Sequence, residues 1–257
     1  MRPLTFGFSP CPNDTFAFHA LVHGLVEAPF AVEPVLLDIE ELNRRAHTGE
    51  LELTKLSFGA VGGVGERYRL LRSGAALGRG VGPLVVAREE RPLAGARIAI
   101  PGRETTAYLL LRLAEPELDD VVELRYDRIL AAVAAGELDA GLIIHESRFT
   151  YAEHGLVKVV DLGEWWEAET GLPVPLAGIY AREGVPTDEV ERSIRASVEY
   201  AFSHPEASRE YVREHSHELS EDVCRAHIEL YVNEFSVDLG EPGLAAIERL
   251  ASASLAA

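Results

Sequence analysis

The chain has 257 residues, of which 47% are hydrophobic, and this length can bury a large core as one large domain or two smaller ones. Its 24 Lys and Arg are outnumbered by 42 Asp and Glu, and the net charge of −18 argues against a nucleic-acid partner, because such binding depends on cations that neutralise phosphates. The sequence has no run of about 18 apolar residues, so neither a membrane-spanning helix nor a membrane partner is expected.

The N-terminal part of the chain alternates short apolar strands with helices. Asn13, Asp14 and Thr15 are typical N-cap residues, and the first helix is expected to begin there. The expected strands are 5–8, 32–38, 53–57, 68–72 and 81–87, and the expected helices are 15–23 and 39–46.

Near residue 87 the composition changes to a charged connector, 88–95, which contains a proline. Asp127 is expected to cap a later helix, and Gly136 is expected to end it. Further strands are expected at 97–100, 123–126, 138–144, 157–162 and 173–181, and helices at 107–114, 128–135, 188–203, 207–215, 220–232 and 241–255.

This alternation predicts an α/β fold with largely parallel strands. The strands fall into two blocks, which predicts two lobes. Lobe I is expected to contain residues 1–87 plus 177–257, with the C-terminal helices folded back onto it, and lobe II residues 88–176. Two chain crossings between the lobes imply a cleft with a two-stranded hinge, and ligand sites favour such interfaces.

The most informative segment is the apolar run 140–144, which ends abruptly in His145. In open α/β sheets, ligands bind outside the carboxyl ends of the strands, so an imidazole is expected where such folds carry out their chemistry. A structural histidine that caps a strand end is the alternative. Nearby, Arg148 has two candidate partners, Glu146 and the substrate.

Three other predicted strand ends carry polar groups, at 9–15, 54–57 and 102–106. Ser57, Thr105 and Thr106 stand at predicted helix starts, where unpaired N–H groups and partial positive charge bind carboxylates and phosphates. Ordinary N-capping by these residues is the alternative.

Several other features are expected to be structural. Cys11 stands at a strand end, where it is either a nucleophile or, more in keeping with the absence of a neighbouring histidine, a small hydrophobic filler. The glycine-rich segment 74–82 matches no phosphate-binding motif, and we expect it to allow close backbone approach. Trp165 and Trp166 are expected to pack in a core.

No metal site is predicted from spacing. The two cysteines, Cys11 and Cys224, are far apart and form no zinc-binding pattern. His215 and His217 are expected to lie on the surface of a C-terminal helix rather than to bind metal. The N-terminus enters a strand pattern without the features of a secretory signal, so a cytoplasmic location is expected.

Six segments, spread over nearly the whole chain, resemble the 1,4-dihydroxy-6-naphthoate synthases of the futalosine route to menaquinone. They are GFSPCPNDTF at 7–16, LTKLS at 53–57, LGRGVGPL at 77–84, PGRETTAY at 101–108, GLIIHESRFTY at 141–151 and YVNEFS at 231–236. The resemblance implies a two-lobed fold like that of type II periplasmic binding proteins. It also implies a lyase that converts cyclic dehypoxanthinyl futalosine to 1,4-dihydroxy-6-naphthoate by breaking a carbon–carbon bond, without a metal or redox cofactor.

The resemblance implies roles for residues that lie at the predicted strand ends. His145 would be the general base, and Lys55, Leu56, Ser57, Thr105 and Thr106 would line the substrate pocket; Asn13 joins them as an expected contact. Histidine has an unperturbed pKa of about 6.5, so it can accept a proton near neutral pH.

The partner expected for this site is a small molecule with a carboxylate, and the chain itself is expected to be a monomer or a simple homodimer. Two alternative functions stay open. One is chorismate dehydratase, an enzyme of the same pathway, and the other is a non-catalytic solute-binding protein, which would normally be exported and would not need an imidazole at the cleft.

Overall fold

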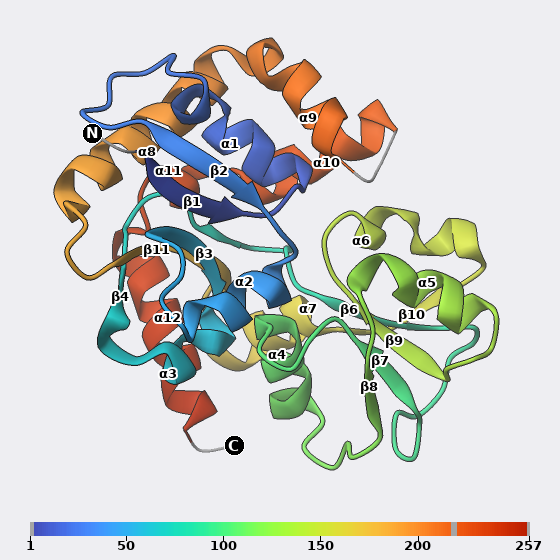
Figure 1. Cartoon of the computed structure of the whole chain (residues 1–257). Helices are drawn as coiled ribbons and strands as arrows, with labels where there is room; N and C mark the ends of the chain where they lie inside the picture. Colours follow the sequence, from blue (N-terminus) through green and yellow to red (C-terminus); the bar gives the residue numbers. More distant parts are fainter. Residues whose placement is uncertain (1–2, 217–219, 256–257) are drawn as a thin grey trace.

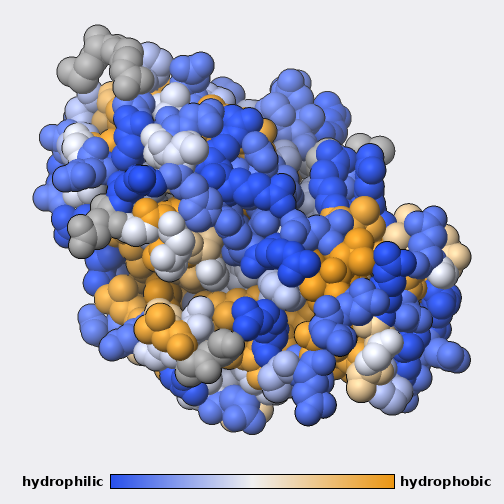
Figure 2. All heavy atoms as spheres, turned by 60° about the horizontal axis from the view of Figure 1, so that its bottom comes forward, coloured by the Kyte–Doolittle hydropathy of each residue, from blue (hydrophilic) through white to orange (hydrophobic). Residues whose placement is uncertain are grey.

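Two β-sheets form the cores of two lobes that lie side by side, and helices flank both (Figure 1). The computed structural model describes residues 3–216 and 220–255, so His217 lies outside the described part of the chain. Over those residues, no helix is long and apolar enough to cross a membrane. Hydrophilic residues cover much of the face shown in Figure 2, and apolar residues gather there in separate patches.

The first sheet has the strand order β2-β1-β3-β11-β4, and β5 pairs with β11 off this path. Its strands are β1 (Leu4–Phe8), β2 (Val32–Leu36), β3 (Leu53–Ser57), β4 (Tyr68–Leu70), β5 (Ala76–Gly78) and β11 (Val174–Arg182). Strand β1 runs parallel to β2 and β3, whereas β11 runs antiparallel to β3, β4 and β5.

The second sheet has the order β10-β6-β9-β7-β8. Its strands are β6 (Leu84–Ala87), β7 (Ile98–Ile100), β8 (Val121–Glu123), β9 (Ala140–Ile143) and β10 (Val157–Asp161). Strand β7 is parallel to β8 and β9, but β6 is antiparallel to β9 and β10. The sheets are therefore mixed, and the prediction of largely parallel strands was wrong. A buried strand has the same apolar pattern in either direction, so the pattern alone does not give its direction.

The chain passes between the two sheets twice, before β6 and before β11. By strand pairing, residues 84–87 belong to the second sheet, although we had expected them in the first lobe. Similarly, residues 174–176 already belong to β11 of the first sheet. The composition change at 88–95 marks a partly exposed connector between β6 and β7, within the second sheet, rather than a passage between sheets.

The helices largely match the predicted pattern, and the C-terminal ones pack on the first sheet and its helix α1. The bounds are α1 (Pro12–Val22), α2 (Ile39–Ala46), α3 (Val61–Val64), α4 (Thr106–Ala114), α5 (Tyr126–Ala134), α6 (Ser147–Thr150), α7 (Leu162–Thr170), α8 (Thr187–Ser203), α9 (Arg209–His215), α10 (Glu221–Tyr231), α11 (Glu234–Val237) and α12 (Gly240–Ser254). The buried hydroxyl of Ser197 joins α8 to α1, because it donates to the carbonyl of Ala17 at 2.8 Å and accepts from the N–H of Leu21 at 3.1 Å.

Helix α1 starts three residues earlier than expected, since Pro12 occupies its first turn, where a missing N–H costs nothing. Helix α7 was not predicted. The carboxylate of Asp161 caps it by accepting from the N–H groups of Gly163 and Glu164. Trp166 on this helix is fully buried and its indole N–H donates to a carbonyl, which confirms the expected core packing.

The glycine-rich segment crosses the start of α7 at very short range. A Cβ placed on Gly82 would lie 2.1 Å from the backbone nitrogen of Gly163, so only glycine fits there. The expected close backbone approach is therefore confirmed at Gly82, on the first passage between the sheets.

Candidate functional site

A cavity that is partly open to solvent lies between the lobes and is lined from both sheets. Residues at the carboxyl ends of β1, β3 and β9, namely Ser9, Ser57 and Ile144, line this cavity, so strand ends from both lobes meet at one place. Six of the residues singled out from the sequence line this cavity, namely Asn13, Lys55, Ser57, Thr105, Thr106 and His145.

Leu56 differs from the other expected pocket residues. Successive side chains of a strand point to opposite faces, so Lys55 and Ser57 face the cavity and Leu56 faces away. The Leu56 side chain is fully buried in the hydrophobic core. Its expected place in the pocket is therefore corrected to a core position.

His145 follows β9 in a strained backbone conformation. Its φ of 58° makes it the one non-glycine residue with positive φ in the part of the chain that the structure describes. Such strain persists where the surrounding structure imposes it, and it clusters at functional sites. The edge of the Tyr126 ring packs against the imidazole, with ring centroids 4.9 Å apart.

The imidazole of His145 is neutral at neutral pH. Burial, helped by the positive charge of Lys55, lowers the pKa of His145 to about 4. Its Nε2 is buried and has no hydrogen-bond partner among the described residues. A neutral imidazole with one nitrogen lone pair is the form that accepts a proton.

A buried ion pair joins the two strand ends of the first lobe. Lys55 on β3 contacts the carboxylate of Asp14 on α1, and both side chains are almost inaccessible to solvent. The second oxygen of Asp14 accepts from the N–H of Ser9 at 3.0 Å and from its hydroxyl at 2.7 Å. We had interpreted Asp14 only as a helix cap. That Lys55 is one of only two lysines in the chain was the available signal of an unusual site.

A second histidine, which the sequence did not single out, reaches the cavity from α10. The amide NH₂ of Asn13 donates to Asp14 at 2.9 Å, which leaves its oxygen to accept from Nε2 of His227 at 3.0 Å. His227 is thereby held with its proton on Nε2, and its buried Nδ1 has no partner among the described residues. Its ring stacks on that of His145 at 6.4 Å, and burial keeps the pKa of His227 well below its ordinary value.

Ser57 is positioned by Asn43, a buried residue of α2. The Asn43 amide donates to the Ser57 hydroxyl at 3.1 Å and accepts from the Ser57 N–H at 2.9 Å. Because the hydroxyl oxygen is used as an acceptor, its own proton is directed elsewhere and is available to a ligand.

The hydroxyls of Thr105 and Thr106 both form hydrogen bonds within the protein. Thr105 is the N-cap of α4, where its hydroxyl accepts from the N–H of Tyr108 at 3.2 Å, so the capping alternative is confirmed for it. The Thr106 hydroxyl donates to the carbonyl of Leu176 at 2.6 Å and accepts from the N–H of Gly59 at 3.0 Å, which ties α4 to the first lobe. The first-turn N–H groups of α4 are the groups that remain to bind an anion there.

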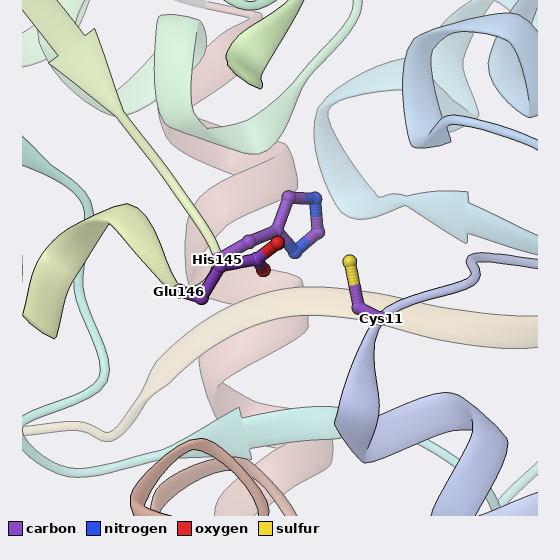
Figure 3. Close-up of side chains that lie close together, drawn as sticks. All are labelled: Cys11, His145 and Glu146. Carbon is purple, nitrogen blue, oxygen red and sulfur yellow. The ribbon is translucent and has the colours of Figure 1, made fainter. Parts of the chain in front are cut away.

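Arg148 and Cys11 both have structural contacts. Arg148 pairs with Asp161 at 3.1 Å and donates to the carbonyl of Gly82. Cys11 occupies the N-cap position of α1 without a capping hydrogen bond from its side chain, and it is buried; burial, together with the charge of Glu146, raises the pKa of its thiol well above the ordinary value. A protonated thiol is a poor nucleophile. Figure 3 shows Cys11, His145 and Glu146 side by side.

Comparison with known proteins identifies a family profile and two similar enzymes. A family profile described as "Menaquinone biosynthesis" matches residues 4–254. A 1,4-dihydroxy-6-naphthoate synthase of Thermus thermophilus is 58% identical in an alignment of 254 residues that covers 97% of this chain and 93% of the relative. The enzyme of that name from Streptomyces coelicolor is 46% identical in an alignment of 256 residues that covers 96% of this chain and 91% of the relative.

Solved structures establish the fold class. A crystal structure of an Archaeoglobus fulgidus protein superimposes with a TM-score of 0.94 at 38% identity, covering 99% of this chain and 97% of that one. A Candida albicans protein described as having the generic periplasmic binding protein fold matches with a TM-score of 0.68 at 12% identity, covering 99% of this chain and 91% of that one. The expected two-lobed periplasmic-binding-protein-like fold is confirmed.

Proposed function

This chain belongs to the menaquinone-biosynthesis family, and 1,4-dihydroxy-6-naphthoate synthases are among its relatives. We propose that its cavity is the active site for the following reaction. The chain is an enzyme that converts cyclic dehypoxanthinyl futalosine to 1,4-dihydroxy-6-naphthoate. It acts as a carbon–carbon lyase, and His145 is its general base. The observation that carries this proposal is the neutral imidazole of His145, held at a strand end beside a cavity between the lobes.

The proposed step is a retro-aldol fragmentation of the sugar-derived ring. A base takes a hydroxyl proton, the O–H electron pair forms a carbonyl, and the adjacent carbon–carbon bond breaks. Its electron pair stays on the fragment that becomes the aromatic product and is later protonated. His145 suits the first of these roles, since it is neutral and has an available lone pair at neutral pH.

Hydrogen-bond donors for a substrate carboxylate lie on the first-lobe side of the cavity and at the N-terminus of α4. The ammonium of Lys55 and the hydroxyl of Ser57 face the cavity, and the N-terminus of α4 adds backbone N–H groups and partial positive charge. The rest of the lining is largely apolar and includes Ile144, Val81 and Leu176, which suits an aromatic ring. A cytoplasmic location and a monomeric or simple dimeric state remain predictions.

The test is incubation of the purified protein with cyclic dehypoxanthinyl futalosine and detection of 1,4-dihydroxy-6-naphthoate by mass spectrometry. We expect product from the wild type and from His154→Ala, which removes an exposed histidine, and none from His145→Ala. Turnover by His145→Ala at the wild-type rate would eliminate His145 as the base. If no protein forms product, chorismate is tried next, and its dehydration would assign the sister activity.

A further inference from the structure

Three side chains from the two lobes lie close together, and only one of them, His145, has a role in the proposed reaction. The thiol of Cys11, a ring nitrogen of His145 and a carboxylate oxygen of Glu146 all lie within 4.8 Å of one another. In Figure 3, one imidazole nitrogen faces the thiol and the carboxylate, and the other points away from them. Cys11 comes from the first lobe and the other two from the second, so the cluster bridges the lobes.

We propose that Cys11, His145 and Glu146 bind a divalent cation of the zinc class and that this binding blocks the imidazole. Thiolate, imidazole and carboxylate are the three ligand types that zinc prefers, and three protein ligands leave a fourth position open. Bonds of about 2.0–2.3 Å place zinc ligands up to roughly 4 Å apart. The three groups therefore need to move together by less than about 1 Å.

The charges of the cluster favour such an ion. A zinc ion with one thiolate, one carboxylate and a neutral imidazole has no net charge, which suits a buried site. Cys11 and Glu146 are both buried, and nearby the charges of Asp14 and Lys55 already balance each other.

The consequence for catalysis follows from the structure of imidazole. A metal on one ring nitrogen takes that lone pair, and the proton then stays on the other nitrogen. His145 can no longer accept a proton in that state. This part of the inference rests on the proposed function, whereas metal binding itself does not.

Metal binding is measured with Cd²⁺ and the purified chain, by calorimetry and by the ultraviolet absorption of a cadmium–thiolate bond. We expect one Cd²⁺ per chain with thiolate absorption in the wild type and in Cys224→Ser, which removes the other cysteine. In Cys11→Ser the absorption should vanish. The affinity of this variant for Cd²⁺ should fall by more than the roughly 10–100-fold that is lost when an outer-shell partner of a metal ligand is removed. Serine is a good N-cap, so this variant should keep the fold, which circular dichroism verifies.

A second variant keeps the test independent of Cys11. Glu146→Gln should weaken Cd²⁺ binding while the thiolate absorption persists at saturating metal. Equal affinity in wild type, Cys11→Ser and Glu146→Gln, or no thiolate absorption in the wild type, would overturn the site.

The blocking role has its own readout. Zn²⁺ should stop product formation by the wild type, and a chelator should restore it. Turnover that is unaffected by saturating Zn²⁺, or that needs it, would overturn the blocking role. If the wild type forms no 1,4-dihydroxy-6-naphthoate, the proposed function fails, and the Cd²⁺ measurements still decide the metal site.

Discussion

Lys55 and Asp14 form an ion pair in the interior of the first lobe, with side chains that are only 5% and 2% exposed. The pair links the end of β3 to α1, and Asn13 extends it to His227. The proposed reaction depends on this pair, because the pair holds Lys55 at the cavity wall and sets the orientation of the Asn13 amide.

Breaking the pair should be costly, whereas replacing both partners should not. Lys55→Met leaves a buried carboxylate without its partner, and we expect a loss of about 3–5 kcal/mol in the free energy of unfolding. The double variant Asp14→Asn with Lys55→Met should recover much of that loss. Urea unfolding of the wild type, both single variants and the double variant measures the coupling, and strictly additive losses would contradict it.

The pH profile of kcat/KM should report the low pKa of His145. Since the neutral imidazole is the active base and its pKa is lowered to about 4, activity should persist well below the ordinary histidine value of 6.5. We expect the acid limb of log kcat/KM to fall toward pH 4. An acid limb at pH 6.5 would contradict a lowered pKa of His145.

His227 should contribute, together with His145, to a fall in stability on acidification. Burial lowers its pKa in the folded protein, so below pH 6.5 the unfolded chain takes up a proton that the folded protein does not. The free energy of unfolding should therefore decrease as the pH falls below 6.5. His227→Gln keeps a donor for Asn13 and should show a weaker dependence in denaturant titrations at several pH values. The exposed-site control His154→Gln should retain the full dependence.

The glycine crossing between the lobes should not tolerate a side chain. In Gly82→Ala, the new Cβ meets backbone atoms of Gly163, which cannot move away by a side-chain rotation. Overpacking of this kind costs about 1–3 kcal/mol, and we expect at least that loss in thermal unfolding. Gly62→Ala is the matched control. Gly62 lies in α3 with no atom near its added Cβ, so alanine should be neutral or stabilising there by up to about 1 kcal/mol.

Local patterns in the sequence were sufficient to locate the strand ends that carry the site. An apolar run followed by a polar residue marks the end of a buried strand, and this pattern placed His145 and Ser57 at the cavity. The capping pattern at Thr105 likewise placed the start of α4. These features depend on neighbours only a few residues away, so the sequence alone determined them.

Long-range packing decided the rest. The directions of β6, β10 and β11 depend on which strands they pair with, and an apolar strand pattern is the same in either direction. His227 was not recognisable as a site residue, because its bond to Asn13 joins segments 214 residues apart. The position of Cys11 beside His145 was likewise not recognisable from the sequence, because the two residues come from different lobes. Side chains that meet across two lobes are brought together by burial of the lobes' apolar surfaces, and no local pattern encodes which of them will meet.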